Sequence, residues 1–320
     1  MALRTTVAGI SSPEALAEAL RAAMYLADDG IATAGYLALA LGKPLLLEGA
    51  PGVGKTEAAK ALSGILGRQL IRLQCFEGID AAAALYEWNY PRQMLAIRQA
   101  KEDQSIDIYR DDFLIERPML MALRRPDSTV LLIDEIDRSD HEFEAFLLEF
   151  LSDFSISIPE RGTLRAAERP VVVLTSNRTR ELSEALKRRC LHLQLGYPNK
   201  EVELEIVRLK APQISEELSE ELVKTIQELR TLDLRKAPSI GETLDWAQSL
   251  VVLSAPRLSK ELIEETISVI AKYDRDAEKI LTHLGVGIPE RKDLGQKEPT
   301  GENPAEALYE RRRRPGAHAH

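Results

Sequence analysis

Gly49–Thr56 carries the residue types that phosphate chemistry requires, because GAPGVGKT matches G-x-x-x-x-G-K-[ST] in full. The glycines let the backbone wrap around phosphates, the lysine bridges the β- and γ-phosphates, and the threonine hydroxyl ligates Mg²⁺. The alternative is an unrelated glycine-rich turn, but an apolar strand precedes the loop and a helix follows it. We therefore predict ATP and Mg²⁺ as cofactors. The expected binding residues are Gly49, Pro51, Gly52, Val53, Gly54, Lys55, Thr56 and Glu57.

Two carboxylates, Asp134 and Glu135, directly follow the apolar run Leu131–Ile133. In a phosphate-loop fold this strand is expected to lie beside the loop. Asp134 would then hold Mg²⁺ through water, and Glu135 would polarise the water that attacks the γ-phosphate. The alternative is a solvated acidic turn that caps the next helix. The presence of the loop upstream favours the catalytic interpretation.

A polar residue and a basic run follow the next apolar strand. Asn177 ends this strand, where a neutral amide could bind the γ-phosphate and position water, although Asn is also a common turn former. Lys187–Arg189 could complement a helix dipole, which is the usual role of such a run. Its functional alternative is an arginine inserted into the nucleotide site of a neighbouring subunit, where it would stabilise transition-state charge.

The elements that position these residues alternate between strand and helix, which predicts a three-layer α/β fold with a parallel sheet and right-handed crossovers. Helical patterning runs from Ser12 to Gly30 and again from Ile31 to Leu41. After residue 198 only amphipathic charged helices are expected. We predict an α/β nucleotide-binding core over 1–198, a small all-helical lid domain over 199–284, and a charged, disordered tail over 285–320.

The composition of the chain limits the classes of binding partner and the cellular compartment that we expect. The chain has 42 Lys+Arg against 51 Asp+Glu, a formal net charge of -9, which disfavours a nucleic-acid-coating or membrane-binding role. Its two cysteines form neither a disulfide framework nor a zinc spacing. No signal-peptide pattern is present, and the most apolar stretch is too short to span a bilayer. A cytoplasmic location is expected.

The order of these motifs resembles the MoxR family of AAA+ ATPases, and within it the CoxD-like subgroup. The resemblance covers roughly residues 12–283 and is carried by LLLEGAPGVGKT, STVLLIDEIDRSD, VVVLTSNRTRELSEALKRRC and KAPSIGETLDWA. It implies a hexameric ring with ATP at the subunit interfaces. Asp134 and Glu135 match the Walker B metal and catalytic acids, and Asn177 matches sensor 1. Arg189 matches the arginine finger that acts in trans, with Arg188 second.

Three segments complete the comparison with that family. The hairpin around Ile156–Leu164 resembles the insertion before sensor 1, and the irregular segment near 90–116 occupies the place of the helix-2 insert. The third lid helix lacks the sensor 2 arginine that the family has near Ser239. Arg235 or Lys236 are the candidates to replace it.

The resemblance implies a chaperone-like ATPase that acts on a protein client, often with a von Willebrand factor A domain partner. CoxD-like members are associated with metal-centre maturation of molybdenum hydroxylases such as carbon monoxide dehydrogenase. One alternative is a nucleotide-gated scaffold with little turnover, which the presence of Glu135 disfavours. Another is a DNA-associated AAA+ motor, which the net charge of -9 disfavours.

Overall fold

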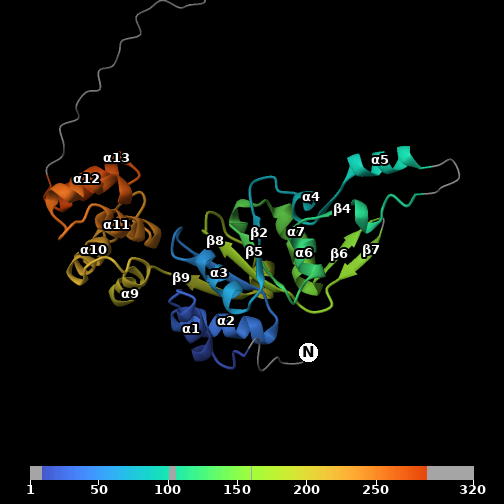
Figure 1. Ribbon diagram of the computed structural model, residues 1–320, viewed down its shortest axis with the longest axis horizontal. Helices are drawn as coiled ribbons and strands as arrows, with labels where there is room; N and C mark the ends of the chain where they lie inside the picture. Colours follow the sequence, from blue (N-terminus) through green and yellow to red (C-terminus); the bar gives the residue numbers. More distant parts are fainter. Residues whose placement is uncertain (1–8, 101–105, 160, 287–320) are drawn as a thin grey trace, which may run out of the picture.

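A five-stranded parallel sheet forms the centre of the computed structural model, which describes residues 9–100, 106–159 and 161–286 (Figure 1). Its strands are β1 (Leu45–Gly49), β2 (Gln69–Gln74), β5 (Thr129–Asp134), β8 (Val171–Ser176) and β9 (Leu191–Leu195). They lie in the order β2-β5-β8-β1-β9, and every neighbouring pair is parallel. The predicted parallel α/β architecture is confirmed.

Helices cover both faces of this sheet. One face packs against α1 (Pro13–Ala22), α2 (Asp29–Leu41) and α3 (Lys55–Ile65), and the other against α6 (Pro118–Arg124), α7 (His141–Asp153) and α8 (Glu184–Arg189). Successive residues of a strand alternate between the two layers. Val130 and Leu132 pack in the layer with α1, α2 and α3, whereas Leu131 and Ile133 pack in the layer with α6, α7 and α8. Burial on both faces explains the continuous apolar runs in the sequence.

Strand β5 lies beside the phosphate loop but does not pair with β1. Strand β1 pairs with β8 and β9, and β8 separates it from β5. The phosphate loop nevertheless reaches β5, because α3 starts at the loop and contacts β1, β8 and β5. The first turn of α3, and not strand pairing, therefore brings the loop to the acidic residues.

The structure corrects the long helix that was expected from Ser12 to Gly30. Helix α1 ends at Ala22, and Met24 adopts a left-handed conformation with φ +63°. Asp28 then starts α2 by accepting a hydrogen bond from the Ile31 amide at 2.7 Å. Residues 23–28 form a connector instead, because this cap competes with a continuous helix.

Two insertions extend from the core, at the end away from α9–α13 in Figure 1. The first contains α4 (Ala81–Ala84), β3 (Tyr86–Trp88), α5 (Tyr90–Gln99), η1 (Asp111–Phe113) and β4 (Leu114–Glu116). It is more regular than expected, because Asn89 caps α5 and β3 pairs with β4. The second is the predicted hairpin, formed by β6 (Ser155–Ile158) and β7 (Gly162–Arg165).

The C-terminal region is helical. It contains α9 (Lys200–Lys210), α10 (Glu216–Leu229), α11 (Ile240–Val252), α12 (Lys260–Ile270) and α13 (Asp274–His283). These helices enclose their own apolar cluster around the fully buried Trp246. Over the described part of 199–284 no strand occurs, as expected. The predicted tail lies, from residue 287 onward, outside the described residues. Among the described residues, no helix is both long and apolar enough to cross a bilayer.

Candidate nucleotide-binding site

The phosphate loop connects β1 to α3 and depends on two glycine conformations. Gly52 has φ +77° and Gly54 has φ +96°, values that L side chains rarely adopt. The Lys55 ammonium donates hydrogen bonds to the carbonyls of Gly49 and Ala50, both at 2.8 Å. It is thereby held over the loop, at the amino end of α3, where both the ammonium charge and the helix dipole favour phosphate.

Lys55 is buried, and burial lowers its pKa from the ordinary value, although three nearby carboxylates oppose this shift. Those carboxylates belong to Asp134, Glu135 and Asp137. The site therefore combines one buried cation with three acids, a charge distribution suited to a polyanion that arrives with a divalent cation.

Asp134 lies at the carboxyl end of β5 and touches the first turn of α3. Its Oδ1 accepts hydrogen bonds from the hydroxyl of Thr56 at 3.3 Å and from that of Thr175 at 2.5 Å. Its Oδ2 is paired with Arg72 of β2, at 2.6 Å from Nη2 and 2.8 Å from Nε. The Asp134 side chain is only 3% exposed. The sequence places Thr56 and Asp134 far apart, and the fold brings them into contact.

Glu135 follows in a left-handed conformation, φ +56°, which is uncommon for a residue with a side chain. Its amide donates to the Thr175 hydroxyl at 2.9 Å, which helps to fix the turn. One oxygen of its carboxylate accepts a hydrogen bond from the side-chain amide of Asn177 at 3.3 Å. The other oxygen accepts from Gln74 at 2.9 Å and Arg138 at 3.1 Å. Backbone strain at such a position is typical of functional sites.

Asn177 is positioned by Asp137, a buried residue of the 3₁₀ turn η2 (Ile136–Arg138). The Asp137 carboxylate accepts hydrogen bonds from the amides of Asn177 and Thr179 at 3.1 and 2.9 Å, and from the Thr179 hydroxyl at 2.6 Å. Burial alone would raise the pKa of Asp137, but these hydrogen bonds leave it below the ordinary value. An ionised Asp137 therefore ties the end of β8 to the acidic turn.

The residues present fit a magnesium ion. Mg²⁺ in phosphate sites keeps several waters and takes one or two protein oxygens in addition to the substrate phosphates. Thr56 and Asp134 supply such oxygens 3.3 Å apart beside the loop. Among the described residues no group of three or more His, Cys, Asp or Glu could hold a metal by itself. The donor set is therefore that of an ion brought in with phosphates.

A pocket of about 480 Å³ adjoins the loop, a size that suits a small ligand. It lies between the core and the helical region. The 23–28 connector, the loop, one side of α3, the 195–199 segment, one side of α9 along its length and the start of α11 line it. Tyr25 contributes an aromatic ring beside Gly54 and is partly buried, and the loss of solvent around its hydroxyl raises the pKa of that group. The pocket is mostly apolar, in contrast to the charged loop.

The helical region contacts the loop through the start of α11. A Cβ atom on Gly52 would lie 2.4 Å from the Cβ of Ser239, so the two backbones meet only because residue 52 is glycine. Lys236 pairs with Glu242 at 2.5 Å, and the Arg235 guanidinium stacks 4.0 Å from the Tyr273 ring centroid. Neither of the two sensor 2 candidates has a hydrogen bond or ion pair to Asp134 or Glu135 in the described part of the chain. Ser239 makes the contact with the loop.

Arg189 is the one predicted catalytic residue that does not join this cluster within the chain. It ends α8, where its Nε donates to the Ser152 hydroxyl at 2.6 Å and its Nη1 to the Ala185 carbonyl at 3.0 Å. Arg188 is paired with Glu184 at 2.7 Å, and its side chain is 79% exposed. Arg188 is therefore on the exposed side of α8, whereas Arg189 is partly buried and faces α7.

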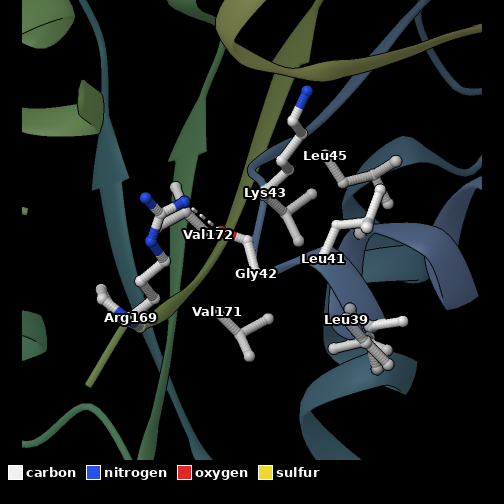
Figure 2. A pocket seen from close by; sticks show the side chains of 13 residues that line it. Leu39, Leu41, Gly42, Lys43, Leu45, Arg169, Val171 and Val172 are labelled. Atoms are coloured by element: carbon white, nitrogen blue, oxygen red, sulfur yellow. Dashed lines mark hydrogen bonds between the residues drawn. The ribbon is translucent and has the colours of Figure 1, made fainter. Parts of the chain in front are cut away.

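A second pocket, of about 250 Å³, lies at the amino ends of β1 and β8 (Figure 2). It is formed by the end of α2 and the start of β8, and Arg169 caps the Gly42 carbonyl there at 3.3 Å. Its lining is largely aliphatic and contains no carboxylate or nucleophile. The residues suited to phosphate chemistry lie instead near the carboxyl ends of the strands.

Four residues of the site were not predicted from the sequence. Arg72 and Gln74 point from β2 toward the two acids, Thr175 binds both acids, and Tyr25 lines the neighbouring pocket. Arg72 and Gln74 alternate with buried apolar residues along β2, and this alternation was the available signal, because side chains two residues apart share a face of the strand.

Comparisons with known proteins identify the domain that carries this site. Residues 44–190 match the model of the AAA domain of the dynein-related subfamily. They span the loop, the acidic turn, the Asn177 turn and α8. Together with the phosphate loop and the acidic turn, this match makes the protein an ATP hydrolase in which residues 44–190 are similar to an AAA domain.

Individual relatives are distant. An uncharacterized protein of Staphylococcus haemolyticus is 24% identical over 225 residues, which are 67% of this chain and 80% of that protein. The gas vesicle ATPase GvpN of Haloferax mediterranei is 26% identical over 203 residues, which are 60% of this chain and 58% of that protein. The Thermotoga maritima RuvB Holliday junction branch migration motor aligns with a TM-score of 0.44 at 19% identity, covering 87% of this chain and 76% of that chain.

Proposed function

We propose that the cluster of Thr56, Asp134, Glu135 and Asn177 beside the phosphate loop hydrolyses ATP, and that this hydrolysis drives the assembly or maturation of a partner protein. The observation that carries the proposal is the convergence of three chain segments on one point. Asp134 touches Thr56 at 3.3 Å, and Asn177 touches Glu135 at 3.3 Å. A structural acidic turn has no need to contact the phosphate loop.

Each group has a role in this proposal. Lys55 and the loop amides bind the phosphates, and the adenosine part lies in the adjoining pocket with Tyr25. Thr56 and Asp134 would hold Mg²⁺, which would supply charge neutralisation at the phosphates. Glu135 accepts the proton of the attacking water, and Asn177 positions that water through its neutral amide. The remaining residues predicted to bind nucleotide, from Gly49 to Glu57, form the loop and its helix start.

Lys55→Ala tests the proposal at the binding step. We expect the affinity for ATP to fall at least about tenfold, because a hydrogen bond to a charged group contributes about 1.5–3 kcal/mol. Isothermal titration calorimetry with ATP and Mg²⁺ would measure it. Lys43→Ala is the matched control, since Lys43 is exposed and lies before the start of β1, at the second pocket (Figure 2). Equal affinity of the Lys55 variant and the parent would refute the assignment of the loop.

The proposal includes a homo-oligomeric ring, with six subunits by resemblance to the MoxR family, in which Arg189 completes the site of a neighbour. A head-to-tail interface that closes on itself is the geometry that places such a residue in trans. The exposure of Arg188 on α8 supports a contact of this helix with a neighbouring subunit. The division into a core over 1–198 and a lid over 199–284 is supported by the separate apolar cluster around Trp246.

Steady-state ATP hydrolysis per protomer, measured across a protein dilution series with Mg²⁺, tests the ring. We expect the rate to rise with protein concentration, and Arg189→Ala to lower it at least about tenfold at every concentration, because trans arginines contribute strongly to phosphoryl transfer. Lys187→Ala serves as the control on the same helix, and Arg188→Ala decides between the two arginines. Full activity in both arginine variants would refute a finger on α8.

The chaperone-like role rests on the resemblance to MoxR proteins, with support from the relative named gas vesicle ATPase GvpN. A protein client, a von Willebrand factor A domain partner and a cytoplasmic location follow from the same resemblance and from the cysteine usage. The CoxD-like subgroup, with a molybdenum hydroxylase as client, is the finer hypothesis and rests on the sequence motifs alone.

A further inference from the structure

Arg72 is a cation of the site that neither the motifs nor the proposed mechanism uses. It lies on β2, the edge strand of the sheet, and its register partner on β5 is Leu132, two residues before Asp134. Side chains two residues apart on a strand share a face, so Arg72 and Gln74 both point toward the acidic turn. Arg72 pairs with Asp134, and Gln74 bonds Glu135.

The hydrogen bonds around Asp134 leave Arg72 as its counter-charge. Oδ1 is bonded by the hydroxyls of Thr175 and Thr56, which are neutral. Oδ2 is bonded by two nitrogens of the Arg72 guanidinium, at 2.6 and 2.8 Å. Lys55 bonds the loop carbonyls. A carboxylate that is 3% exposed requires a partner, because an unpaired buried charge is strongly unfavourable.

This arrangement places two cations in competition. We propose that Arg72 is the resident counter-cation of Asp134, which Mg²⁺ must displace or tolerate when nucleotide binds, and that Arg72 thereby sets the Mg²⁺ concentration at which nucleotide binds tightly. The guanidinium also donates to Gln74, so it keeps an acceptor when it leaves Asp134. Its side chain is 54% exposed, which gives it room to move. The inference rests on the proposed ATP site.

The test measures binding and not turnover. The probe is the fluorescent nucleotide mant-AMPPNP, whose anisotropy is followed at fixed protein concentration while Mg²⁺ is titrated, and again in EDTA. In Arg72→Gln we expect the Mg²⁺ midpoint to fall at least about fivefold, because a unit positive charge beside the site is lost while solvent screening limits the effect. Binding in EDTA should change by less than about twofold, since it does not involve the competition.

The control is Arg208→Gln on α9, which removes an equal charge from a surface arginine paired with Glu216. Its Mg²⁺ midpoint should equal that of the parent. Circular dichroism confirms that each variant is folded. If Arg72→Gln does not fold, Arg72→Lys carries the test, and we expect a smaller decrease because one ammonium cannot make both contacts with Oδ2.

The two proposals fail in different ways. A parent protein that binds the probe neither with Mg²⁺ nor in EDTA would contradict the proposed ATP site. A parent that binds it with a measurable Mg²⁺ midpoint, together with a folded Arg72 variant whose midpoint is unchanged or higher, would overturn only the role of Arg72.

Discussion

Glu135→Gln is expected to keep ATP bound while lowering its hydrolysis at least about 100-fold, which is the lower end of the contribution of general acid–base catalysis. Glutamine retains the shape of the side chain and an acceptor oxygen for the Asn177 amide, which lies 3.3 Å from Glu135. It cannot accept the proton of the attacking water. The measurements are phosphate release at saturating ATP and ATP affinity by calorimetry.

The matched control for this variant is Glu149→Gln on α7, which removes an exposed carboxylate of the same domain. Its turnover should equal that of the parent. A Glu135 variant that turns over ATP at close to the parental rate would contradict the role of Glu135 as base. A variant that loses ATP binding would show instead that the left-handed turn at residue 135 shapes the phosphate loop.

The motifs predicted the site better than they predicted the connections around it. Asp134, Glu135 and Asn177 lie together because they follow the carboxyl ends of neighbouring parallel strands, and Thr56 joins them from the first turn of α3. The order of the strands was not accessible in the same way. Strand β8 lies between β1 and β5, and the apolar runs of all three strands look alike in sequence.

Long-range contacts between polar residues could not be predicted either. The pairing of Arg72 with Asp134 depends on the register of β2 against β5, and a shift by one residue would turn Arg72 to the other face. The contact of Gly52 with Ser239 joins segments almost two hundred positions apart in the numbering. Local sequence patterns hold no information on either of these two contacts. The connector at 23–28 was missed for another reason, because the cap at Asp28 was hidden in an apolar-periodic segment.

The site also shows why the acidic turn is rigid. Thr175 bonds the carboxylate of Asp134 and the amide of Glu135, and Asp137 bonds the backbone after β8. Two neighbouring strands, β5 and β8, are thus joined at their ends by side chains as well as by the ladder. A base that must face water without moving gains orientation from such a frame.

Arg230→Met is expected to destabilise the helical region by at least about 3 kcal/mol, because removal of one partner leaves the other charge buried and unpaired. Arg230 makes two contacts with Glu203, at 2.6 and 2.7 Å, and the two side chains are 7% and 0% exposed. Thr243 and Gln227 also donate to Glu203, at 2.9 and 2.6 Å. Glu203 therefore joins α9, α10 and α11, and its charge has no access to water.

Urea unfolding followed by the fluorescence of Trp246 measures this effect. The chain has two tryptophans, and a Trp88→Phe background leaves Trp246, which is fully buried among the C-terminal helices, as the reporter of that region. The double variant Glu203→Met with Arg230→Met is the decisive control, since replacing both members of a buried pair by apolar residues is often close to neutral. It should recover most of the lost stability. A double variant as unstable as Arg230→Met alone would mean that Arg230 acts through its stacking on Tyr197, 4.4 Å from the ring centroid, and not through Glu203.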